Sequence, residues 1–218
     1  MRDIVIAGAG AALATPLIEH YLRAGDRVTA VYRNTKPKSP PGDLSALRVR
    51  RINQFDPAEG VDVLITLTGA TDNAKLGEMT DLQWATVVSD CLAAPFDYLR
   101  LCLPHLKDGN VVVVGSVVGS MGGRGCANYA AAKAGLIGLV RAAANEYARD
   151  SVCVNLLELG YTELGMGAEL PEKVKDCALG SIPLRRFATA EDFVLAVDFL
   201  SRTRYMTGGV LTLSGGLR

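Results

Sequence analysis

The chain has 218 residues, of which 49% are hydrophobic, and its 23 Lys and Arg residues balance 23 Asp and Glu residues. This length permits one large core, and a net charge of zero gives no general attraction to nucleic acid or to an anionic membrane. No apolar stretch reaches the length of a membrane span, and the first residues lack a signal-peptide pattern, so we expect a cytoplasmic protein with one domain over residues 1–218.

Short apolar runs alternate with segments of helical pattern along the whole chain. The expected strands cover residues 4–7, 28–32, 48–55, 61–67, 111–114, 152–157 and 210–213. The expected helices cover residues 12–24, 81–106, 127–149 and 191–202, with capping signals at Thr80 with Gln83 and at Thr189 with Asp192. This alternation predicts an α/β fold, a single Rossmann-type doubly wound parallel sheet in three αβα layers.

The region between the third and fourth expected strands is too short for a regular crossover. Only a handful of residues separate the segment 48–55 from the strand that starts near Val61, whereas a parallel crossover usually needs about a dozen. Either an extended loop crosses the end of the sheet, or the third strand is short or irregular. The proline-rich segment 34–43 is expected to be a loop.

A glycine-rich turn follows the first expected strand and enters a helix. Backbone amides at such a turn bind the pyrophosphate of a dinucleotide, although glycine also serves any tight turn between a strand and a helix. At the end of the second strand, Arg33 stands where an acidic residue would accept a hydrogen bond from a ribose 2′-hydroxyl. Arg33 therefore favours the 2′-phosphate of NADP over NAD, unless it is an ordinary exposed charge. The expected pyrophosphate contacts are Gly8, Gly10, Ala11, Ala12 and Leu13.

Three side chains between residues 115 and 133 form a candidate catalytic set. Tyr129 and Lys133 are four residues apart and share one face of a helix, while Ser116 follows an apolar strand. We expect the ammonium of Lys133 to lower the pKa of the Tyr129 phenol, and the Ser116 hydroxyl to hold a developing alkoxide. A tyrosine four residues before a lysine is also common in helices without any catalytic role.

No metal site is expected from the sequence. The five cysteines are widely spaced and contain no CxxC pair, and the two histidines are isolated.

Several stretches resemble the short-chain dehydrogenase/reductase family, and more narrowly its 3-oxoacyl-[acyl-carrier-protein] reductases. The most specific is SVVGSMGGRGCANYAAAKAGLIGL, from Ser116 to Leu139, and residues 154–166, 182–201 and 205–216 add to it. The resemblance implies that Ser116, Tyr129 and Lys133 are catalytic and that Lys133 also binds the nicotinamide ribose. It further implies cofactor contacts at Asp56, Gly69, Gly160, Tyr161 and Thr162.

The implied activity is the NADPH-dependent reduction of a 3-oxoacyl thioester, carried on acyl carrier protein, in fatty-acid or polyketide-type biosynthesis. We expect a homotetramer or dimer built on helices 81–106 and 127–149, and a lid over residues 166–186. Lys107 and Arg149, placed at or near the carboxyl edge of the sheet, are expected to meet the acidic carrier protein.

The sequence also departs from the family pattern. Alanine stands at Ala12 and Ala14 in place of glycine, and Cys91 stands in place of a helix asparagine that supports proton relay. Leu159 and Leu164 replace a proline and a threonine. These changes imply weaker cofactor binding or slower proton relay, and they leave two alternatives open. One is a catalytically degraded subunit that assembles with an active relative, and the other is a secondary-alcohol dehydrogenase of a specialised pathway.

Overall fold

A parallel sheet of seven strands forms the centre of the molecule. The computed structural model describes residues 1–217, and the strand order is β3-β2-β1-β4-β5-β6-β7. From β1 the chain builds outward to β3 and then returns to place β4 on the other side of β1, as in a doubly wound fold. The predicted fold class is therefore confirmed. The strands are β1 (Asp3–Ala7), β2 (Arg27–Tyr32), β3 (Leu47–Arg51), β4 (Val63–Thr66), β5 (Asn110–Val114), β6 (Cys153–Leu159) and β7 (Val210–Leu213).

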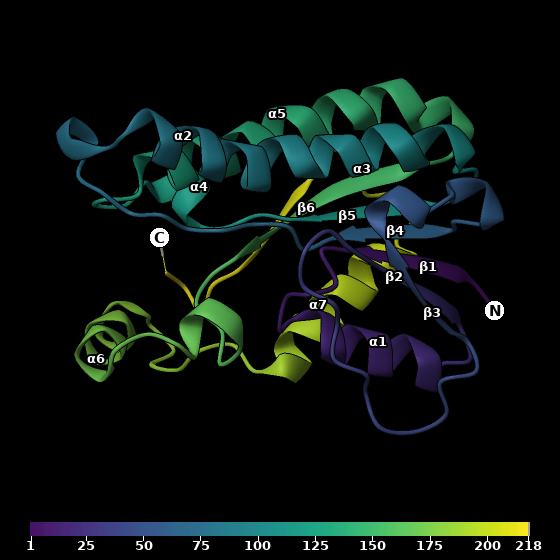
Figure 1. Cartoon of the computed structure of the whole chain (residues 1–218), viewed down its shortest axis with the longest axis horizontal. Helices are drawn as coiled ribbons and strands as arrows, with labels where there is room; N and C mark the ends of the chain where they lie inside the picture. Colours follow the sequence, from purple (N-terminus) through teal and green to yellow (C-terminus); the bar gives the residue numbers. More distant parts are fainter. Residues whose placement is uncertain (218) are drawn as a thin grey trace.

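Helices cover both faces of the sheet (Figure 1). On one face, α1 (Ala14–Arg23) and α7 (Ala190–Arg202) bury apolar side chains against Ile4 and Ile6. On the other face, α3 (Ala94–Cys102) and α5 (Ala127–Tyr147) pack against Val5, which lies between Ile4 and Ile6 in β1. Successive residues of a strand point to opposite faces, so near-continuous apolar strands supply both cores. The remaining helices are α2 (Asp81–Val88), α4 (Val118–Met121) and α6 (Glu172–Ser181).

Two crossovers lack an α-helix. The loop 33–46 joins β2 to β3, and β3 is joined to β4 by two short 3₁₀ turns, η1 (Ile52–Gln54) and η2 (Pro57–Glu59). Both alternatives left open by the sequence hold, because β3 ends at Arg51 and a loop then crosses the sheet. Ile52 and Phe55 pack against the core on the α3 and α5 face, where a crossover helix would otherwise supply apolar side chains.

The long helix predicted over residues 81–106 is interrupted. It begins at α2 with the predicted capping box of Thr80 and Gln83, and a π-turn (Ser89–Ala93) then separates α2 from α3. Pro95 explains this turn, because its ring nitrogen has no hydrogen to donate to the carbonyl four residues earlier. The backbone widens instead, and the Ala94 amide donates to the Ser89 carbonyl five residues earlier.

The second capping box is also confirmed, since the Thr189 hydroxyl accepts from the Asp192 amide at the start of α7. Helix α1 begins at Ala14 and not at residue 12, which leaves Ala12 and Leu13 in the preceding turn. None of the helices within residues 1–217 combines the length and the apolar character needed to cross a bilayer.

Candidate active site

The loop after β5 holds Ser116 at the carboxyl edge of the sheet. The amides of Gly115 and Val117 continue the β5–β6 ladder by donating to the carbonyls of Leu157 and Leu159, at 2.8 and 3.0 Å. The Ser116 hydroxyl lies on this fixed backbone and accepts from the Val118 amide at 3.3 Å. Its position is therefore set by the sheet.

Helix α5 brings the other two members of the candidate set to the same place. Tyr129 and Lys133 lie one turn apart on the buried face of α5, and the Lys133 Nζ is 5.7 Å from the centre of the Tyr129 ring. Ser116 lies near enough to the phenol to lower its pKa in part. The structure thus brings Ser116, Tyr129 and Lys133 together as the sequence predicts.

The prediction for the Tyr129 pKa is wrong. Burial raises the pKa of this phenol to about 12, and the hydrogen bond with Ser116 offsets only part of the rise. Lys133 does not contribute to this shift, and its Nζ donates instead to the carbonyls of Thr68 and Val114, at 3.2 and 3.1 Å. Burial in turn lowers the pKa of Lys133. At neutral pH the phenol is protonated, which suits a proton donor.

The π-turn directs Cys91 into the interior beside this set. The Cys91 thiol accepts from the Ala70 amide at 3.4 Å and donates to the Ala70 carbonyl at 3.2 Å. Lys133 contacts the same loop at Thr68, two residues earlier. The thiol, whose pKa is raised by burial, therefore fixes the loop after β4 together with Lys133.

A groove of about 300 Å³ opens where the strand order reverses, at the carboxyl ends of β1, β2 and β4. Its walls come from the glycine-rich turn, the end of β2, the loop after β4 and the layer of α3. The lining residues are Gly8, Gly10, Ala11, Tyr32, Arg33, Asn34, Thr35, Leu67, Thr68, Gly69, Asp90, Ala94 and Tyr98.

The turn at the base of this groove fits a phosphate group. Within residues 1–217 the amides of Gly10, Ala12 and Leu13 have no acceptor, and they lie at the N-terminal end of α1, which has no side-chain cap. Unpaired amides at a helix N-terminus are suited to an anion. Gly8 has a φ of +76°, and a Cβ there would lie 2.9 Å from the Thr68 amide nitrogen, so the turn requires glycine at this position.

The two alanines that replace glycine in this turn have different surroundings. Ala14 is fully buried in the α1 core and does not line the groove. Ala12 is exposed, and its methyl group would lie 3.8 Å from a Cβ built on Gly165 in the segment after β6. Of the two methyl groups, that of Ala12 is therefore the one that lies at the surface of the turn.

Of the remaining predicted cofactor contacts, three lie at the carboxyl edge of the sheet and one, Asp56, lies outside the groove. Gly160, Tyr161 and Thr162 follow β6 at the same carboxyl edge, where Tyr161 stacks on Phe187 with ring centres 5.3 Å apart. The Thr162 hydroxyl donates to the Leu164 carbonyl at 2.8 Å. Asp56 does not line the groove, because its carboxylate accepts from the Ala58 amide and caps η2.

The predicted placement of Lys107 and Arg149 is wrong. Lys107 precedes β5 and Arg149 precedes β6, so both lie at the amino ends of parallel strands. Ser116 and Tyr129 are at the carboxyl ends, on the opposite edge of the sheet. Both basic residues come at the end of a helix, and in βα units the helix returns the chain to the amino edge.

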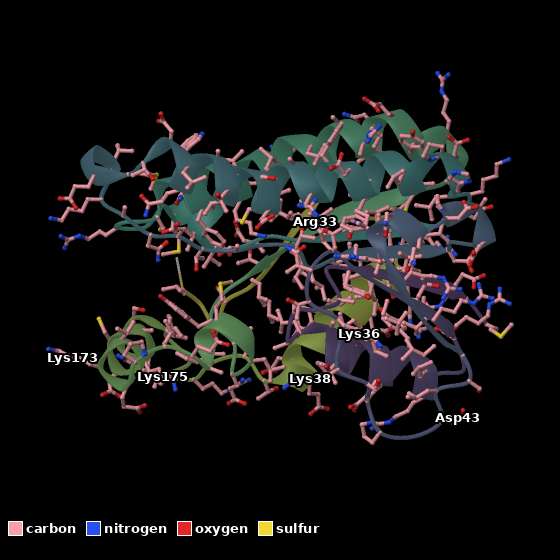
Figure 2. The ribbon with its side chains drawn as sticks, in the orientation of Figure 1. Arg33, Lys36, Lys38, Asp43, Lys173 and Lys175 are labelled. Carbon is pink, nitrogen blue, oxygen red and sulfur yellow. The ribbon has the colours of Figure 1, made fainter. Side chains whose placement is uncertain are left out.

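The predicted lid, residues 166–186, contains a 3₁₀ turn, η7 (Gly165–Gly167), and α6. Helix α6 carries Lys173 and Lys175, and Figure 2 shows both at the end of the molecule away from the loop 33–46. The Thr71 hydroxyl and the Met166 sulfur are 3.9 Å apart, so the segment meets the loop that follows β4.

Within residues 1–217 there is no cluster of three or more potential metal ligands.

The groove residues of the helical layer, Asp90, Ala94 and Tyr98, were not predicted from the sequence. Asp90 comes from the π-turn and Tyr98 from α3, both more than fifty residues after the turn and β2. The local sequence does not mark Asp90 as a groove residue, because Pro95, which creates the π-turn, is five residues further along the chain.

Alanine at Gly10 is expected to weaken binding of the dinucleotide expected from the sequence. A Cβ at this position would lie 2.8 Å from the Thr35 Cβ and would also meet the Thr35 carbonyl oxygen, so the loop after β2 must move away from the turn. A cost of about 1–3 kcal/mol corresponds to a rise in Kd of about fivefold to 150-fold. Fluorescence titration with NADPH measures this change.

The matched control is Gly138→Ala on α5, where an added Cβ has no neighbour within 4 Å. This variant should bind the dinucleotide as the parent does. Equal affinity of the Gly10→Ala protein and the parent would contradict the placement of the groove.

Comparison with known proteins gives three kinds of match. A family model described as "Enoyl-(Acyl carrier protein) reductase" matches residues 47–218. The 3-oxoacyl-[acyl-carrier-protein] reductase FabG of Staphylococcus epidermidis is 30% identical over 233 aligned positions, which cover 96% of this chain and 94% of that protein. The protein of the same name from Thermotoga maritima is 37% identical over 162 positions, covering 72% of this chain and 66% of the relative.

A second relative name and a solved structure agree with these matches. Acetoacetyl-CoA reductase of Acinetobacter is 37% identical over 172 positions, covering 76% of this chain and 69% of the relative. The crystal structure of an oxidoreductase of the short chain dehydrogenase/reductase family from Burkholderia thailandensis superposes with a TM-score of 0.84 at 29% identity. The match covers 99% of this chain and 92% of that one.

Proposed function

Because the chain belongs to the short-chain dehydrogenase/reductase family of NAD(P)-dependent oxidoreductases, we propose that it reduces a 3-oxoacyl thioester to the 3-hydroxyacyl product with NADPH. The observation that carries this proposal is the meeting of Ser116, Tyr129 and Lys133 beside a groove whose free amides suit a dinucleotide phosphate. The names of the relatives favour a thioester on acyl carrier protein, in fatty-acid or polyketide-type biosynthesis.

The chemistry follows from the three side chains. The hydroxyls of Ser116 and Tyr129 donate hydrogen bonds to the substrate carbonyl oxygen and so favour the negative charge that develops on it. Tyr129, protonated at neutral pH because burial raises its pKa to about 12, then transfers its proton to that oxygen. A bound nicotinamide supplies the hydride. Lys133 holds the loop after β4 through Thr68 and binds the nicotinamide ribose.

The rest of the proposed cofactor site follows the groove. The amides of the turn receive the pyrophosphate, and Arg33 at the end of β2 receives the 2′-phosphate. Gly69 lies beside Lys133 in the loop after β4, and Gly160, Tyr161 and Thr162 complete the nicotinamide side. Turn residues in this site are Gly8, Gly10, Ala11, Ala12 and Leu13.

Assembly into a homotetramer or dimer is part of the proposal. Leu82, Trp84 and Phe96 on the outer side of α2 and α3 are 76, 44 and 46% exposed. Large apolar side chains on neighbouring helices suit contact with a second copy of the chain. A molecular mass equal to one chain by light scattering at micromolar concentration would count against this assembly.

Titration with NADPH distinguishes this function from that of a degraded subunit. The exposed methyl group of Ala12 at the phosphate turn is the feature that favours a subunit without catalytic activity. The proposal predicts saturable binding of NADPH by the purified chain, measured as a change in its fluorescence. Absence of saturable binding would favour a structural partner of an active relative.

A further inference from the structure

A pair of opposite charges spans the dinucleotide groove. The Arg33 Nη1 atom at the end of β2 lies 3.5 Å from the Asp90 Oδ1 atom in the π-turn. Figure 2 shows Arg33 in the middle of the molecule, where the lower layer meets the layer of α3, whereas Lys36 and Lys38 lie further along the loop. Both members of the pair line the groove, with side chains 42 and 40% exposed.

This pair differs from the surface ion pairs of the same helical layer. Arg100 and Asp97 pair within one turn of α3, and such pairs follow from helical spacing alone. Arg33 and Asp90 are 57 residues apart and come from opposite walls of the groove. Within residues 1–217 neither has another partner of opposite charge within salt-bridge distance.

Asp90 therefore supplies from the π-turn the carboxylate that the end of β2 lacks. A carboxylate in this part of a doubly wound fold accepts a hydrogen bond from the ribose 2′-hydroxyl of NAD, whereas an arginine accommodates a 2′-phosphate. This groove presents both groups within 3.5 Å of each other, at the end of β2 where the adenosine ribose is expected. The 2′-phosphate of NADPH would meet the positive charge of Arg33 on one wall, and the 2′-hydroxyl of NADH would meet the negative charge of Asp90 on the other.

We propose that Asp90 sets the cofactor selectivity of the groove by reducing the preference for NADPH over NADH. This inference rests on the proposed function, because it assumes that the groove binds the adenosine half of the cofactor. A 2′-phosphate carries a charge of about −1.5 to −2 at neutral pH. Asp90 repels this charge and competes for the guanidinium of Arg33, but it accepts from a 2′-hydroxyl. The same carboxylate thus weakens the binding of NADPH and strengthens the binding of NADH.

The test compares Kd values for NADPH and NADH in the parent, in Asp90→Asn and in the matched control Asp97→Asn. For partly exposed charges we expect about a threefold to fivefold change in each Kd, in opposite directions. The ratio of the NADH Kd to the NADPH Kd should therefore rise about tenfold to twenty-fivefold in Asp90→Asn. The control removes an equivalent carboxylate outside the groove and should leave the ratio within about twofold of the parent.

Adenosine 2′,5′-bisphosphate and AMP serve as probes of the adenosine half alone. Asp90→Asn should bind the bisphosphate more tightly than the parent does, in the same proportion as NADPH. A dinucleotide ratio that is unchanged or lower in Asp90→Asn overturns the inference while leaving the reductase proposal intact. Failure of the parent to bind either dinucleotide overturns both. Selective binding without turnover of a thioester overturns only the reductase proposal.

Discussion

Phenylalanine in place of Tyr129 is expected to slow thioester reduction by about two to four orders of magnitude while leaving NADPH affinity unchanged. The substitution removes the proposed proton donor and keeps the buried ring, which packs with Val87 and Ala132. Because burial raises the pKa of this phenol to about 12, the parent holds the proton throughout the neutral range. Steady-state rates and an NADPH titration of the variant measure the two effects separately.

Tyr21→Phe is the matched control for this result. Tyr21 is also a buried phenol whose pKa is raised to about 12, mainly by desolvation, but it lies in the core between α1 and α7. Its loss should leave turnover within about twofold of the parent, apart from any change in stability. A Tyr129→Phe protein with a tenth or more of the parent rate would show that another group delivers the proton.

Methionine in place of Lys133 is expected to impair binding and turnover together. Lys133 is 4% exposed, and its ammonium supplies the hydrogen bonds to the carbonyls of Thr68 and Val114. Without it these acceptors lose their partner, which costs about 1–3 kcal/mol each where they are buried. The loop after β4 also loses its contact with Lys133, although the Cys91 thiol at Ala70 and the Asn128 amide at Asp72 still hold it. We expect a turnover loss of about a hundredfold or more, together with a higher Kd for NADPH.

Urea unfolding measures the change in stability and NADPH titration the change in affinity, with Lys107→Met as the control for both. Lys107 is exposed at the amino edge of the sheet, so its loss should change neither quantity. A Lys133→Met protein with the stability and the NADPH affinity of the parent would contradict the role given to its two hydrogen bonds.

The sheet was predictable because its signals are local. Buried strands such as β5 are continuous apolar runs, and the capping boxes at Thr80 and Thr189 require side chains only three residues apart. The π-turn was missed because one continuous helix was expected over residues 81–106, although Pro95 in its interior cannot donate a backbone hydrogen bond. The missing helix between β2 and β3 was not stated as such, although the proline-rich loop that replaces it was recognised.

The candidate site was predictable in part for the same reason. Spacing along α5 places Tyr129 and Lys133 on one face, but it does not give the direction of the Lys133 Nζ or the desolvation of the phenol. Those two features reverse the expected shift of the Tyr129 pKa. Asp90 joins Arg33 only through tertiary packing, so the charge that opposes Arg33 is invisible in the sequence around β2.

Turnover of NADPH with a 3-oxoacyl thioester tests the central claim most directly. The parent chain, given NADPH and acetoacetyl thioester on acyl carrier protein, should oxidise one NADPH for each 3-hydroxybutyryl thioester formed. Tyr129→Phe should do so about a hundredfold or more slowly. Saturable NADPH binding without any thioester-dependent oxidation, or an equal rate in Tyr129→Phe, would contradict the assignment of Ser116, Tyr129 and Lys133 as a ketoreductase site.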